Sequence, residues 1–130
     1  MSEPIVAVDS SEIREGKFEE VVSAIERLVA FVEANEAETI AYSIYVDKEH
    51  RRMTVVQIHP SPEAMELHLE VAAPVFREFA DLLTLLRVDF YGRPSEALLA
   101  RMREKAQLLG GAPVFVNELE AGFTRFAARP

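Results

Sequence analysis

The chain has 130 residues, of which 49% are hydrophobic and 28% are charged, and this composition is typical of a globular protein. A chain of this length buries roughly two-thirds of its surface on folding, so we expect a single domain spanning residues 1–130. A net charge of −8 argues against nucleic acid and anionic membranes as partners, the lack of cysteines excludes disulfides and thiolate metal sites, and no segment is apolar for long enough to span a membrane.

The N-terminal region predicts a strand and no secretory signal. Residues 5–8 form a continuous apolar run that is too short for a helix, bounded by Pro4 and by the polar residues 9–11. This pattern is typical of a strand buried on both faces. Glu3 stands where a secretory signal would carry Lys or Arg, so we expect a cytoplasmic protein.

An amphipathic helix and a hairpin follow. From residue 17 to about 34, apolar residues recur at three- and four-residue steps, which predicts a helix. Residues 39–47 and 52–59 are rich in β-branched and aromatic side chains and predict an antiparallel hairpin. If its loop holds an even number of residues, Tyr42 faces Gln57, and both lie on the same side of the sheet as His59.

The second predicted helix begins with Ser61 as N-cap and Pro62 in its first turn. Its apolar stripe continues to Phe79, but Pro74 lies inside the stripe. Because proline has no N–H for the helical hydrogen bonds, we expect a bend or a break there.

A strand, a helix and a tail complete the chain. Residues 84–91 predict a strand, Ser95 caps a third helix, and the glycine pair at 110–111 ends it. In the tail, 114–119 and 122–126 predict either one bulged strand or two short ones.

The order strand, helix, strand, strand, helix, strand predicts an α+β, ferredoxin-like unit over a core at 4–92, with an extension of one helix and one strand at 94–127. Apolar residues occur at both parities of 40–46 and 85–91, which indicates that both faces of the sheet are covered. A homodimer packing sheet on sheet is the simplest cover for the face without helices. The alternative is the C-terminal segment folding back over its own sheet.

Two histidines and a tyrosine are the candidate catalytic residues. His68, on the second helix, can face His59 and Tyr42 on the sheet, with Gln57 as a ligand-binding neighbour. The alternative is purely structural, with His59 at a sheet edge and His68 satisfied by a backbone group or water. Histidines at 50, 59 and 68 lack the spacing of a helical ligand pair, so we expect no metal site.

Arg87 and Tyr91 on the predicted fourth strand are further candidates for ligand binding. Arg87 alternates with Asp89, so it either joins an ion pair or faces an acidic ligand, and Tyr91 is otherwise a packing aromatic.

The segment from 53 to 79 resembles the antibiotic biosynthesis monooxygenase family, whose members show Glu-x-Trp at a strand end, a Ser-x-Glu-Ala turn and a helix His. The corresponding residues are Gln57 for the Glu, His59 for the Trp, Ser61, Glu63, Ala64 and His68, with Tyr42 at the family's strand tyrosine. The resemblance covers roughly 4–92; the part after Gly92 is longer than in a typical member.

The resemblance implies a ferredoxin-like protomer, a dimeric α/β barrel and a pocket between helices and sheet. Some relatives oxygenate polycyclic phenols or quinols in that pocket without a cofactor. Haem-degrading relatives use an Asn on the first strand together with the Trp and the helix His. This chain has no Trp, and on its first strand the polar residue nearest to such an Asn is Asp9. We therefore expect oxygenation of a small aromatic, quinol-like ligand with no cofactor. The alternative is a non-catalytic small-molecule-binding or dimeric interaction domain.

Overall fold

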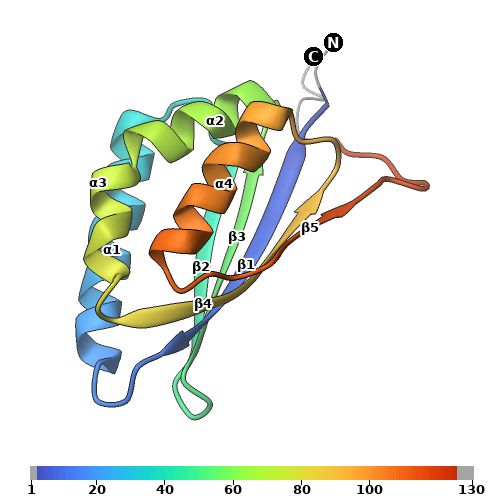
Figure 1. Cartoon of the computed structure of the whole chain (residues 1–130). Coiled ribbons are helices and arrows are strands. Elements are labelled where there is room, and N and C mark those ends of the chain that lie inside the picture. Colours follow the sequence, from blue (N-terminus) through green and yellow to red (C-terminus); the bar gives the residue numbers. More distant parts are fainter. Residues whose placement is uncertain (1–2, 126–130) are drawn as a thin grey trace.

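The computed structural model describes residues 3–125 and contains one five-stranded sheet with the helices on one of its faces (Figure 1). This arrangement confirms the predicted α+β, ferredoxin-like fold. In chain order the elements are β1 (Ile5–Ile13), α1 (Phe18–Asn35), β2 (Ala41–Asp47), β3 (Arg52–His59), α2 (Pro62–Val71), α3 (Ala73–Phe76), the short 3₁₀ helix η1 (Arg77–Phe79), β4 (Leu83–Tyr91), α4 (Glu96–Leu108) and β5 (Val114–Asn117).

The strands lie in the order β2-β3-β1-β4-β5. The first four pair antiparallel, and β5 adds to β4 in parallel at the far edge. We call the face that carries the helices the inner face and the opposite one the outer face. Because β1 and β3 both lie inside the sheet, the polar side chains on their inner face are enclosed between sheet and helices.

The first strand is longer than its apolar run predicts. β1 continues through Asp9 and Ser11 to Ile13, and every second residue is buried. The predicted end at residue 8 was therefore wrong. The physical reason is that β1 is the central strand and pairs with β3 on one side and β4 on the other over its whole length, so backbone hydrogen bonds hold it extended despite its polar side chains.

A bulge in β4 decides which of its residues face the helices. Ser10 of β1 pairs with Arg87, but Ser11 pairs with Leu85, so Leu86 is an extra residue in β4. The bulge changes the parity of the strand: Leu85 and Val88 both face inward, and Arg87 faces outward. The bulge thus explains why apolar residues occur at both odd and even positions of this strand. The pattern in β4 alone therefore does not require the outer face to be covered.

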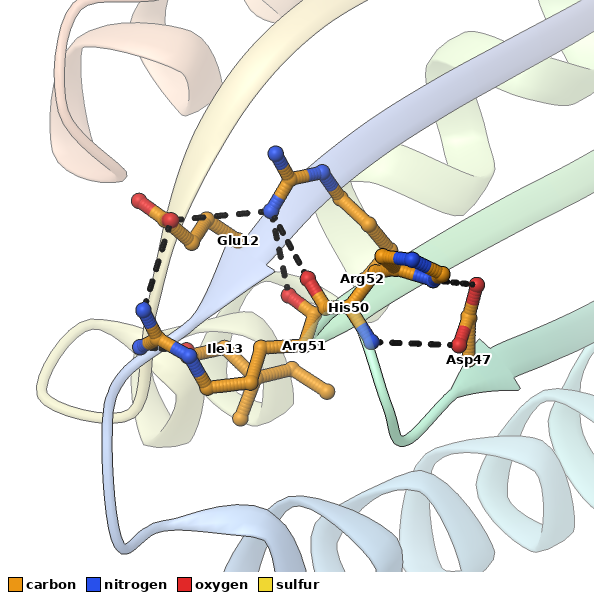
Figure 2. Close-up of polar contacts among 6 residues, drawn as sticks. All are labelled: Glu12, Ile13, Asp47, His50, Arg51 and Arg52. Atoms are coloured by element: carbon orange, nitrogen blue, oxygen red, sulfur yellow. Dashed lines mark hydrogen bonds and ion pairs between the residues drawn. The ribbon is translucent and has the colours of Figure 1, made fainter.

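The turn between β2 and β3 is held by charged groups (Figure 2). His50 Nδ1 lies 2.8 Å from Asp47 Oδ2, and Asp47 Oδ1 accepts a hydrogen bond from the His50 main-chain N–H at 3.2 Å. The guanidinium groups of Arg51 and Arg52 lie 3.8 and 3.5 Å from Glu12 at the end of β1. The basic run is therefore paired with acids in an exposed turn, which argues against a free anion-binding patch.

The second helix breaks where proline predicts. α2 ends at Val71, and α3 restarts at Ala73 with Pro74 in its first turn. Ser61 caps α2 by accepting a hydrogen bond from the main chain of Ala64 at 3.1 Å. Phe76, the last residue of α3, is buried.

The C-terminal extension forms a helix and one short strand. Ser95 caps α4, whose Leu98 and Met102 are fully buried. β5 ends at Asn117, beside the end of β4 at Tyr91. From there to residue 125 the chain forms no further strand, because β4 offers no further backbone to pair with. The predicted strand at 122–126 was wrong as far as residue 125; Phe126 lies outside the described residues.

The apolar core lies between the helices and the inner face of the sheet. Its larger members include Ile5, Val21, Leu28, Met65, Phe76, Phe79, Leu83, Phe90, Leu98 and Met102. Within residues 3–125, no helix combines the length and the apolar character needed to cross a membrane.

Candidate functional site

The hairpin places three of the predicted site residues side by side on the inner face. Tyr42 of β2 lies directly opposite Gln57 of β3, which confirms the predicted register, and His59 is two residues further along β3. Both Gln57 and His59 are completely buried. The Gln57 carboxamide oxygen accepts a hydrogen bond from His59 Nε2 at 2.8 Å. β3 lies between β2 and β1, so His59 is not on an edge strand.

His68 of α2 reaches the same place from above the sheet. Its Nδ1 lies 2.6 Å from a carboxylate oxygen of Glu36, and the two side chains are only 0% and 5% exposed. Because a carboxylate accepts, this contact puts the proton of neutral His68 on Nδ1 and leaves the lone pair on Nε2. Glu36 therefore orients the ring as a carboxylate orients a catalytic histidine.

Three aromatic rings lie close to the His68 ring. Its ring centre lies 5.0 Å from that of Tyr42, 5.1 Å from that of His59 and 5.4 Å from that of Phe76. The predicted cluster of two imidazoles and a phenol is thus brought together by β2, β3 and α2. The segment α3 closes it with the Phe76 ring.

A second buried pair lies on the same inner face. Asp9 of β1 is 3% exposed, and the Lys105 side chain from α4 is 10% exposed. Lys105 Nζ is 4.0 Å from Asp9 Oδ2 and 4.0 Å from the centre of the Phe76 ring. Lys105 thus makes a cation–π contact with a ring that also touches His68.

Burial sets the protonation of the cluster. It lowers the pKa of His59 from 6.5 to about 3, with His68 adding to the shift, and it lowers the pKa of His68 against the opposing effect of Glu36. Burial and the charges of Asp9 and Glu36 raise the pKa of Tyr42 well above 10.0. At neutral pH both imidazoles are therefore neutral, and the phenol keeps its proton.

The same desolvation acts on the second pair. Burial raises the pKa of Asp9 while Lys105 opposes the shift, and burial lowers the pKa of Lys105 while Asp9 opposes it. The charged form of each group is thus partly stabilised by its partner.

Six buried polar atoms of this region have no hydrogen-bond partner within residues 3–125. They are Asp9 Oδ2, Glu36 Oε2, the Tyr42 hydroxyl, Gln57 Nε2, His59 Nδ1 and His68 Nε2. Native proteins rarely leave such atoms without a partner, so their concentration in one place makes this cluster the candidate functional site. Among the same residues, no group of three or more His, Asp or Glu side chains is arranged to hold a metal ion.

A small cavity and two surface grooves adjoin the cluster. The cavity, about 20 Å³, is lined by Asp9, Tyr42, Phe76 and Lys105 among other residues, and has room for about one water-sized group. Tyr42 also lines a groove of about 310 Å³ that reaches Glu36. Phe76 and Lys105 also line a groove of about 410 Å³ beside α2, α3 and α4. The shared side chains place the cavity next to both grooves.

The structure does not bring Arg87 or Tyr91 to this cluster. Both lie on the outer face of β4, and their exposure follows from the parity that the bulge imposes. Arg87 donates two hydrogen bonds to Asp89, at 2.7 and 3.0 Å, which is the ion pair predicted as one of two alternatives.

The sequence analysis did not identify Glu36 or Lys105, and it gave Asp9 no role in the site. All three are charged residues at positions where the pattern of the helix or strand predicts burial. Glu36 follows Val32 by four residues, and Lys105 follows Met102 by three, so each continues the buried stripe of its helix. Asp9 falls on the inner parity of β1. A charged residue on the apolar face of a helix or strand is a candidate for a buried ion pair or hydrogen bond, because burying a charge without a partner costs too much free energy.

The buried state of His59 predicts a pH-dependent stability. The folded pKa of about 3 lies below the ordinary 6.5, so between these values the unfolded chain binds more protons, and stability falls as the pH falls. We expect urea unfolding at pH values from 7 to 4 to show a steeper loss in the wild type than in His59→Gln, by up to about 1.4 kcal/mol per pH unit. Parallel stability curves for the two proteins would contradict a neutral, buried His59.

Comparison with known proteins gives matches in structure alone. No family model matches the sequence, and no curated protein matches it. MupZ from Pseudomonas fluorescens matches with a TM-score of 0.73 and 18% identity, over 95% of this chain and 96% of that one. A candidate antibiotic biosynthesis monooxygenase from Caulobacter crescentus matches with a TM-score of 0.62 and 18% identity, over 68% and 88%. SnoaB, a cofactor-independent oxygenase from Streptomyces nogalater, matches with a TM-score of 0.60 and 13% identity, over 72% and 96%.

These matches confirm the resemblance at the level of the fold. The three matched structures differ in how much of the present chain they cover. Residues 1–92 make up 92 of the 130 residues, so a match over 95% of the chain must include most of the C-terminal extension. MupZ therefore shares the helix that carries Lys105 as part of its fold.

Proposed function

We propose that the protein is a cofactor-independent monooxygenase acting on a small aromatic, quinol-like molecule, with His68 as the proton acceptor. The observation that carries the proposal is the buried His68–Glu36 hydrogen bond, which leaves Nε2 without a partner inside the aromatic cluster. The likeness in fold to SnoaB supports the class of reaction. Because fold alone does not imply function, the assignment of roles depends on the side chains.

His68 starts the reaction by removing a hydroxyl proton from the substrate. Its lowered pKa keeps Nε2 unprotonated at neutral pH, and once the proton has arrived, Glu36 stabilises the imidazolium. The resulting anion is electron-rich and reduces O₂ by one electron, and the radical pair combines into a C–O bond. The new bond forms at a ring carbon that carries one hydrogen. His68 returns its proton to the peroxide, and the hydroperoxide then loses water together with that ring hydrogen, which leaves a carbonyl group. One oxygen atom then enters the product, the other leaves in water, and the substrate supplies all the electrons.

The other members of the cluster hold the substrate oxyanion. Tyr42 keeps its proton because its pKa is raised, so its hydroxyl can donate. Gln57 donates through Nε2, which has no partner among the described residues, and His59 orients the Gln57 carboxamide through the 2.8 Å hydrogen bond. Donors placed in a dry site before the reaction stabilise developing charge strongly.

The test is oxygen uptake by the purified chain, without added metal or cofactor, on a panel of quinols and polycyclic phenols. Under ¹⁸O₂ we expect consumption of one O₂ per product molecule and one labelled oxygen atom in the product. Uptake no faster than in buffer across the panel, with the protein folded, would rule the activity out.

A second candidate function is binding of a small aromatic ligand without chemistry. The buried polar atoms without a hydrogen-bond partner favour it, because they can hold a ligand whether or not a reaction follows. Ligands that raise the melting temperature and are recovered unchanged in the presence of air would support this candidate over the oxygenase.

We also propose that two copies of the chain pack outer face to outer face as a homodimer. All helices cover the inner face (Figure 1), and the outer face carries partly buried or exposed apolar side chains from all five strands. They include Val6, Val8, Tyr45, Val56, Ile58, Tyr91 and Phe115. The alternative cover, the C-terminal tail, leaves Leu119 and Phe123 themselves 70% and 76% exposed. A second copy would bury both the face and these side chains.

A further inference from the structure

The Asp9–Lys105 pair is a buried charge pair to which the proposed chemistry gives no role. Asp9 comes from the central strand and Lys105 from α4, and their side chains are only 4% and 10% exposed. Asp9 Oδ2 and Lys105 Nζ are 4.0 Å apart, which is too far for a hydrogen bond. A buried ion pair rarely stabilises a fold more than apolar packing would, so its presence beside the His68 cluster calls for another explanation.

The contact between His68 and Glu36 favours a protonated ring. A carboxylate 2.6 Å from Nδ1 stabilises the imidazolium form, in which Nε2 also carries a proton. An imidazolium has no lone pair, so it cannot accept a proton from another molecule. Burial disfavours this form, and a second cation close to the ring disfavours it further.

Lys105 is placed to provide that second cation. Its Nζ lies 4.0 Å from the centre of the Phe76 ring, and the centre of the Phe76 ring lies 5.4 Å from that of His68. Because the Lys105 and His68 side chains are both buried, water screens the charge between them poorly. Burial lowers the pKa of His68, Glu36 opposes this shift, and the charge of Lys105 adds to the lowering.

Asp9 is placed to act on Tyr42. The two residues line the same cavity of about 20 Å³, and the Tyr42 hydroxyl has no hydrogen-bond partner within residues 3–125. Burial raises the pKa of Tyr42, and the charges of Asp9 and Glu36 raise it further. The cation of the buried pair thus acts on His68 and the anion on Tyr42, and the centres of these two rings are only 5.0 Å apart.

The titratable groups close to the His68 ring come from four different elements. They are Glu36 at the end of α1, Tyr42 of β2, His59 of β3 and, behind the Phe76 ring, Lys105 of α4. Burial lowers the pKa of His59 to about 3, so at neutral pH this ring adds no positive charge. Burial also lowers the pKa of Lys105, but Asp9 opposes this shift and so helps to keep Lys105 charged.

We propose that Asp9 and Lys105 are positioning residues that determine where the protons of the neighbouring Tyr42 and His68 side chains lie. Lys105 keeps Nε2 of His68 unprotonated, and Asp9 keeps the proton on the Tyr42 hydroxyl. The use of His68 as a proton acceptor rests on the proposed function, whereas the effect of Lys105 on its protonation does not. In the proposed reaction, a nearby cation also makes the His68 imidazolium more acidic, which favours return of the proton to the peroxide.

The test is a ¹H–¹⁵N NMR titration of the His68 ring, over the pH range in which every variant stays folded by circular dichroism. In Lys105→Met, His68 should become protonated at a higher pH than in the wild type, because the cation is gone. Lys105→Met leaves Asp9 buried without a cation, so the Asp9→Asn/Lys105→Met variant, which has neither charge, is the deciding measurement and should show the same upward shift. Lys105→Arg keeps the charge and should restore the wild-type behaviour.

Arg101→Met is the matched control, because Arg101 also lies on α4 but is 43% exposed, and water and salt screen its charge. It should leave the titration of His68 unchanged. The proposal is wrong if His68 becomes protonated at the same pH in the wild type and the double variant, or stays neutral in both. It is also wrong if Arg101→Met shifts the titration as much as Lys105→Met. The titration contains no substrate, so a failure of the oxygen-uptake assay leaves its result valid, and an unchanged titration does not contradict the oxygenase activity.

Discussion

Replacing His68 by glutamine is expected to lower the turnover number for the best substrate of the oxygen-uptake panel by about 100-fold or more. Glutamine keeps a polar side chain of similar size that can still donate to Glu36, but it provides no nitrogen lone pair to accept the substrate proton. The Michaelis constant should change much less, because the proton acceptor acts mainly in the transition state. Initial rates of oxygen uptake, measured with both proteins at equal concentration, give the comparison.

The control for this substitution is His50→Gln, which makes the same change in the exposed turn between β2 and β3. This variant should react at the wild-type rate. A His68→Gln enzyme that retains more than about a tenth of the wild-type turnover would assign proton removal to another group.

Replacing Val56 by aspartate is expected to convert the proposed dimer into a folded monomer. Val56 lies on the outer face of β3, between Val8 of β1 and Ser43 of β2. Because a twofold interface contains every residue twice, each substitution buries two carboxylates without partners, at several kcal/mol each. The dissociation constant should rise by about 100-fold or more. Sedimentation velocity at micromolar concentration separates the two states, and far-UV circular dichroism checks the fold.

Leu67→Asp is the matched control for the interface. Leu67 lies on α2 and is 53% exposed on the helical layer, away from the outer face. The same charge placed there should leave the dimer intact. If the wild type itself sediments as a monomer, the apolar outer face has another cover, and the homodimer proposal is wrong.

Much of the fold could be predicted from the sequence because local rules determine it. The four-residue turn after Asp47 fixes the register of the hairpin, and with it the positions of Tyr42, Gln57 and His59 on one face. Pro74 cannot continue a helix, so the break at Ala72 follows from covalent structure. These features depend on residues that are close together in the sequence, so they can be predicted without knowing the tertiary contacts.

The parts that could not be predicted depend on contacts between distant segments. The extra residue Leu86 in β4 becomes visible only when β4 is paired with β1, and it is this bulge that turns Arg87 away from the site. Glu36 meets His68 across 32 residues of sequence, and Lys105 meets Asp9 only after α4 has packed on the sheet. Extending the helix and strand periodicity to Glu36, Lys105 and Asp9 would have placed them on buried faces, but periodicity does not identify partners.

The proposed reaction depends most directly on the protonation of one imidazole ring, that of His68. Long-range ¹H–¹⁵N correlation spectra of the ¹⁵N-labelled protein at neutral pH report which ring nitrogen carries the proton. We predict a neutral His68 with its proton on Nδ1, hydrogen-bonded to Glu36, and with Nε2 bare. A proton on Nε2, or on both nitrogens, would contradict the account, because His68 would then have no lone pair with which to accept a proton from a substrate.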